Sequence, residues 1–163
     1  MAGLPVYLQR RRQSVLNAAA RLIYGIGFRD NITDAFICLH WLCVPQRIQF
    51  KLAVLTYKFL FNHALRYIGP LVRVTDLPDR RARRSANTNA LLVPSVRLSS
   101  VGDRAFLVAA PRTWNDLPTT VTSAQSLQSF QRHLETYLYQ RFFQDIIVTP
   151  EWTLQQPSLF RPL

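Results

Sequence analysis

The acidic side chains of this sequence are too few and too scattered to build a two-metal catalytic centre. The chain has nine Asp and Glu among 163 residues, and no two of them are adjacent. Polymerases and nucleases that use two Mg²⁺ ions need several carboxylates that converge on the metals. Asp76 and Asp79 are close together, but they stand beside arginines and are interpreted as turn residues. Metal-dependent catalysis is therefore not expected, and the sequence predicts no metal site and no other cofactor.

Cysteine and histidine side chains could in principle bind zinc, at Cys38, His40 and Cys43. A tetrahedral zinc site needs four suitably placed ligands. On a helix Cys38 and His40 would point in different directions, and His63 belongs to another element. Both cysteines are interpreted as small buried apolar residues. The sequence also lacks a G-x-S-x-G nucleophile elbow, and its five glycines form no phosphate-binding loop.

Arginine is the residue type that stands out. The net charge is +11, and the twenty basic residues comprise two lysines and eighteen arginines. Guanidinium groups bind phosphates through paired hydrogen bonds and stack on bases, and Tyr24, Trp41 and Trp114 could add aromatic surfaces. We therefore expect RNA or DNA backbone as the partner, and a protein-interaction module that uses its apolar helices is the alternative. The candidate contacts are the clustered arginines Arg10, Arg11, Arg12, Arg80, Arg81, Arg83 and Arg84.

The elements that must position these arginines are predicted to be mainly helical. Apolar residues recur every three or four positions from about residue 8, and Gly25 can end this first helix. A second helix is expected from Asn31, and Pro45 can open a third. Residues 47–67 are apolar on almost all sides, which predicts a central helix.

The remaining chain is predicted to contain a basic loop, a short β element and one more helix. Residues 70–89 are rich in polar and basic side chains and predict an exposed loop. Residues 91–93 and 96–98 lie on either side of Pro94 and predict short strands. Residues 102–118 form a compact segment in which Pro111 and Pro118 stand at the two ends of the aromatic part. An apolar stripe after Ser123 predicts the last helix. The expected fold class is mainly α, a helical bundle-like piece with a short β-hairpin or strand element in the middle.

Composition excludes several other classes of protein. With 48% hydrophobic and 12% aromatic residues, the chain is not expected to be disordered throughout. Two cysteines and the absence of a secretory segment after Met1 favour an intracellular location, in the nucleus or cytoplasm. Lys51 and Lys58 interrupt the most apolar region, so no membrane-spanning segment is expected.

Several ordered motifs together resemble one protein family. The chain is similar to the C-terminal region of non-LTR (LINE-type) retrotransposon reverse transcriptases of the Jockey-like and chicken-repeat-like clades, over about residues 4–143. The stretches that carry the resemblance are LQRRRQSVLNAAARLIYG, DAFICLHWLCVPQRIQFKLAVLTYKFL, RRSANTNALLVP, VGDRAFLVAAPRTWNDLP and SLQSFQRHLETYLY. The sequence departs from the family at Cys43, where proline is usual, and at Glu135, where lysine is frequent.

The resemblance implies a fragment of an RNA-directed DNA polymerase encoded by a transposable element. Residues 1–27 would match a thumb-like helix, with Arg10 to Arg12 near the template-primer backbone, residues 28–143 a C-terminal helical domain, and residues 144–163 a tail foreign to the family. The family's catalytic aspartates lie upstream of the matching region. This chain alone is therefore not expected to be an enzyme, and the upstream polymerase domain becomes a further expected partner.

Overall fold

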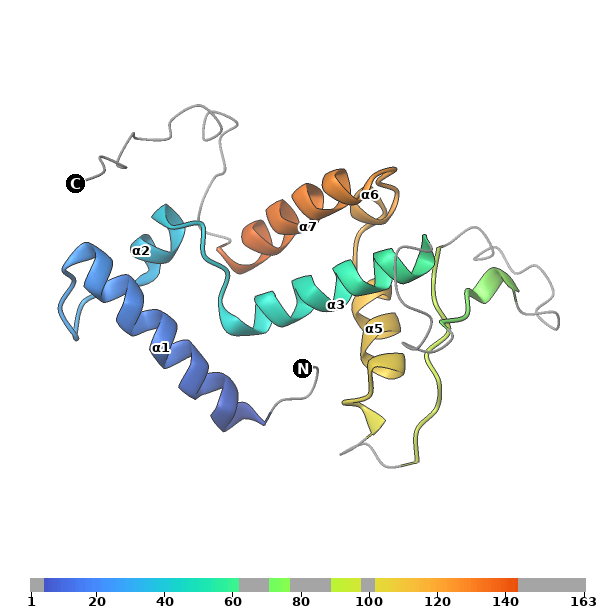
Figure 1. The fold of residues 1–163 in the computed structure, drawn as a ribbon, viewed down its shortest axis with the longest axis horizontal. Helices are drawn as coiled ribbons and strands as arrows, with labels where there is room; N and C mark the ends of the chain where they lie inside the picture. Colours follow the sequence, from blue (N-terminus) through green and yellow to red (C-terminus); the bar gives the residue numbers. More distant parts are fainter. Residues whose placement is uncertain (1–4, 62–70, 77–88, 98–101, 144–163) are drawn as a thin grey trace.

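The computed structural model describes residues 5–61, 71–76, 89–97 and 102–143, and this part of the chain is mainly helical (Figure 1). The prediction of a mainly α fold is therefore confirmed. None of the described helices has the length and hydropathy that a bilayer-spanning helix requires. The elements in chain order are α1 (Val6–Tyr24), α2 (Thr33–Cys38), α3 (Val44–Leu60), the short 3₁₀ helix η2 (Val74–Asp76), α5 (Phe106–Asn115), α6 (Thr119–Thr122) and α7 (Leu127–Phe142).

Helix α3 is the central element, as its apolar composition predicts. It contacts α5, α7 and α1, and Figure 1 shows it running between α7 on one side and α5 on the other. Pro45 lies in its first turn, where the missing amide hydrogen is not needed. Because neighbouring helices cover α3 on several sides, its apolar side chains can be buried without a sheet.

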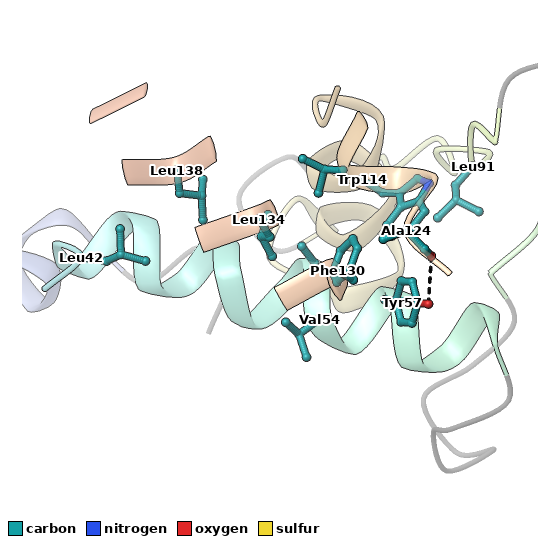
Figure 2. Close-up of a cluster of buried hydrophobic side chains, with 11 residues drawn as sticks. Leu42, Val54, Tyr57, Leu91, Trp114, Ala124, Phe130, Leu134 and Leu138 are labelled. Carbon is teal, nitrogen blue, oxygen red and sulfur yellow. Dashed lines mark hydrogen bonds between the residues drawn. The ribbon is translucent and has the colours of Figure 1, made fainter. Parts of the chain in front are cut away.

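The main core is built around stacked aromatic rings from three helices (Figure 2). The ring of Phe130 in α7 lies 4.4 Å from that of Tyr57 in α3 and 5.7 Å from that of Trp114 in α5, measured between centroids. The hydroxyl of Tyr57 donates a hydrogen bond of 3.1 Å to the carbonyl oxygen of Ala124. Farther along α7, Leu134 and Leu138 continue the buried stripe that the sequence predicts. These contacts fix α5 and α7 against the central helix.

A second, smaller core joins α1 and α2 to the end of α7. Ala20, Phe36 and Phe143 are buried together there. Gly25 adopts a left-handed conformation with φ of 62° and ends α1, as predicted. The hydroxyl of Tyr139 donates a 2.8 Å hydrogen bond to the carbonyl of Ile37 and so ties α7 to α2.

The predicted β element is wrong for the described residues, which contain no strand. Only an isolated antiparallel bridge joins Arg73 to Leu91 within residues 71–76 and 89–97. The side-chain amide of Asn115 instead bonds both the N–H and the carbonyl of Leu91, each at 2.9 Å. Pro94 lacks the amide hydrogen that a continuous ladder would need. The amide of Leu92 donates to the carbonyl of Val72, and the amide of Val74 donates to that of Ala90. Residues 72–74 therefore pair with one edge of residues 90–92, while Asn115 bonds the other edge.

Helix α5 lies in a segment that the sequence predicts only as compact. Pro111 stands inside it and leaves the carbonyl of Leu107 without its usual helical partner, which is why the sequence does not favour a helix there. Burial compensates for this lost hydrogen bond, because Val108, Ala110 and Trp114 all face the core.

The start of α7 is capped by Ser126, whose side chain accepts a hydrogen bond from the amide of Ser129 at 3.1 Å.

Candidate nucleic-acid interface

The first arginine cluster lies in the N-terminal half of α1. Arg10, Arg11 and Arg12 are all exposed there. Successive residues of an α-helix point about 100° apart, so the three side chains fan around the helix rather than forming one contact surface. A single phosphate backbone can therefore be reached by at most two of the three.

The second arginine cluster, Arg80, Arg81, Arg83 and Arg84, lies outside the described residues. Its part in an interface stays a prediction from the sequence. The expected boundary between the helical domain and the tail, at residues 143 and 144, also stays a prediction, because residues 144–163 lie outside the described part of the chain.

A groove between α1 and α3 brings one arginine of the first cluster next to basic residues of another element. Its volume is about 620 Å³. Arg12 contributes from α1, and Arg47 and Lys51 contribute from α3. Apolar side chains make up the rest of the lining, namely Val15, Leu16, Val44, Ile48, Leu52, Leu55 and Phe106. The groove thus combines an apolar floor with cations from both walls.

The guanidinium of Arg47 is held in place at this groove. Its Nε donates a 2.8 Å hydrogen bond to the carbonyl of Leu42, and its central carbon lies 5.7 Å from the centre of the Trp41 ring. Cation–π stacking and the hydrogen bond both restrict the side chain before any ligand arrives. A planar group that is already oriented loses less conformational entropy when it binds an anion.

A basic stripe runs along α3 and was missed by the sequence reasoning. Arg47 and Lys51 are four residues apart and Lys58 follows seven residues later, so all three lie on one helical face. The signal was present in the spacing, but it is not a run of adjacent charges. Helices α1 and α3 together carry seven Lys and Arg and no Asp or Glu.

The acids of the described residues lie on other elements. Asp103 precedes α5, and its Oδ1 lies 2.9 Å from Nη1 of Arg112. The side chains of this pair are 38% and 50% exposed, so solvent weakens the attraction between them. Outside α1 and α3 the described residues have seven arginines and six acids, so most of the net positive charge of the described chain lies on these two helices.

The three aromatic side chains predicted to assist the arginines differ in their exposure to solvent. Trp114 is only 2% exposed and belongs to the core, so it is not available to a ligand. Trp41 is half-buried under Arg47. Tyr24 is 46% exposed at the end of α1.

Cysteine and histidine form no metal-binding arrangement among the described residues, where no three Cys, His, Asp or Glu side chains gather. Cys38 is exposed, so its predicted burial is wrong, and Cys43 is half-buried. His40 has a positive φ of 51° and stacks on Tyr139, with ring centroids 5.7 Å apart. Burial raises the pKa of Tyr139 to about 12, and nearby Cys38 adds to the effect. These groups hold α2 against α7.

Comparisons with known proteins returned no match to a family profile, a curated protein or a solved structure.

Proposed function

We propose that this chain is a nucleic-acid-binding fragment of a retrotransposon reverse transcriptase, and that α1 and α3 hold the phosphate backbone. The observation that supports this proposal most strongly is the distribution of charge. These two adjacent helices have seven cations and no acid, and three of the cations line one groove. Concentrated arginine and lysine without compensating carboxylates are typical of surfaces that bind polyanions. The resemblance of the motifs to the C-terminal region of non-LTR reverse transcriptases supports the same function.

In this proposal the fragment binds RNA or DNA beside the polymerase domain and does not itself catalyse nucleotide addition. Phosphates replace solvent around the guanidinium groups, and counterions leave the nucleic acid. Backbone contacts of this kind position the strand without reading its sequence. The palm with its catalytic aspartates would lie in the upstream polymerase domain, which the resemblance makes a partner.

A charge-matched pair of variants tests the proposal. R10Q/R11Q/R12Q removes the first cluster, and R97Q/R104Q/R132Q removes three exposed arginines from other elements. Fluorescence anisotropy with a labelled RNA oligonucleotide and a labelled DNA duplex gives the affinities. At about 0.1 M salt we expect the first variant to bind at least about tenfold more weakly than the second.

Two outcomes contradict the proposal. Equal losses in both variants mean that net charge alone attracts the nucleic acid and that α1 is no interface. A wild-type chain without measurable affinity for either oligonucleotide removes the nucleic-acid function, and a circular dichroism spectrum typical of helices shows that unfolding is not the reason.

A further inference from the structure

The groove between α1 and α3 leaves apolar side chains open to solvent. Val15 and Leu55 line it from opposite walls and are 70% and 40% exposed. Phe106, at the start of α5, adds to the same lining. Contiguous exposed apolar surface of this kind marks sites of interaction with other molecules.

The chemistry of the floor distinguishes between possible occupants. Nucleic-acid bases stack on aromatic faces, and among the described residues of this lining Phe106 alone is aromatic. The other apolar residues of the groove are aliphatic, and aliphatic side chains pack well against Leu, Ile, Val and Met of another protein. The floor therefore fits a protein segment better than a row of stacked bases.

The charges of the groove specify the partner further. Arg12 stands on one wall and Arg47 and Lys51 on the other, and none of the described residues in the lining is acidic. We propose that this groove docks an amphipathic helix of a partner protein, with its apolar stripe on the floor and Asp or Glu along both edges of the stripe. Helix-in-groove binding uses apolar anchors at three- and four-residue spacing, and complementary charge fixes the orientation of the helix.

The spacing of the basic residues agrees with a helical partner. Arg47 and Lys51 are one helical turn apart, so carboxylates four residues apart on a partner helix can face both at once. The hydrogen bond from Arg47 to the carbonyl of Leu42 keeps one of these cations oriented. A helix bound here would compete with nucleic acid for Arg12, Arg47 and Lys51, and it would use the apolar side chains of the groove in addition to the charges.

A designed peptide can probe the groove directly. The peptide has about 16 residues, Leu at three- and four-residue spacing, Glu on both edges of the stripe and Ala elsewhere. Two controls are a scrambled peptide of identical composition and a peptide with Lys in place of every Glu. The protein variants are V15Q/L55Q, which changes the floor without changing charge, and L22Q/I23Q, which changes exposed apolar residues of α1 outside the groove lining.

We expect the acidic helical peptide to bind the wild-type chain at least about tenfold more tightly than either control peptide. V15Q/L55Q should lower that affinity about tenfold or more, whereas L22Q/I23Q should leave it within about twofold. V15Q/L55Q should lower the RNA affinity much less than the peptide affinity, because all three cations of the groove remain.

Three results overturn the inference. Equal binding of the ordered and scrambled peptides reduces the interaction to charge attraction. Loss of RNA affinity in V15Q/L55Q, without an effect on the peptide, assigns the groove to nucleic acid alone. Sedimentation of the wild type as a dimer and of V15Q/L55Q as a monomer, with no peptide bound by either, assigns it to a second copy of the chain.

Discussion

The salt dependence of nucleic-acid binding should differ between two variants that remove the same number of charges. R10Q/R11Q/R12Q removes three consecutive arginines from α1, which point about 100° apart. R12Q/R47Q/K51Q removes three cations that line one groove. If α1 and α3 hold the backbone together, the second variant loses more contacts to a single strand than the first.

The size of the difference follows from counterion release. Each phosphate contact adds about 0.9 to the slope of log affinity against log salt for duplex DNA, and about 0.7 for a single strand. At most two of the consecutive arginines reach one backbone, so R10Q/R11Q/R12Q should flatten the slope by no more than about 1.8 or about 1.4. The groove variant should flatten it by up to about 2.7 or about 2.1, because all three cations can face the same strand.

Anisotropy titrations at several salt concentrations, from about 0.05 to about 0.3 M, measure both slopes. Circular dichroism and thermal melting control for Arg47, whose replacement also removes the hydrogen bond to Leu42. An equal slope for the two variants, or a larger loss in R10Q/R11Q/R12Q, refutes the reasoning from helix geometry.

Two further predictions concern the contacts that position the helices. Asn115→Ala removes both hydrogen bonds to the buried backbone of Leu91, so the free energy of unfolding in urea should fall by about 2 to 4 kcal/mol. The control Gln128→Ala, at an exposed position, should change the free energy of unfolding by under about 0.5 kcal/mol. Tyr139→Phe should be about 1 kcal/mol less stable at neutral pH, because the bond to Ile37 is lost. Folding raises the pKa of Tyr139 to about 12, so the stability of the wild type should fall as the pH rises from about 10 toward 12. The difference in Tm between the wild type and Tyr139→Phe should narrow over the same range. A difference in Tm that stays constant contradicts this prediction.

Those parts of the fold that depend on local patterns could be predicted from the sequence. The end of α1 at Gly25 and the apolar stripe of α7 follow from backbone preference and helical periodicity. Helix α5 could not be predicted in the same way, because Pro111 argues against a helix and burial in the core overrides it. The predicted β element is wrong for a related reason, because the partners of residues 90–92 are distant in the sequence: residues 72–74 bond one edge through a single bridge, and Asn115 bonds Leu91 on the other edge.

The candidate site was predictable only in part. A run such as Arg10 to Arg12 is obvious in a sequence, yet a helix spreads it over different faces. Arg47 and Lys51 are separated in the sequence, and folding places them on one wall of a groove opposite Arg12. Spacing along a predicted helix could have identified their shared face, but the facing of α1 and α3 depends on tertiary packing.

The most direct test of the central claim is to map where RNA touches the chain. Photo-crosslinking of the wild-type chain to an RNA that contains 4-thiouridine, followed by mass spectrometry of the peptides, identifies the contact segments. We expect crosslinks in α1 and α3, and these should disappear at high salt because counterions compete for the phosphates. Crosslinks confined to α5 and α7 would contradict it.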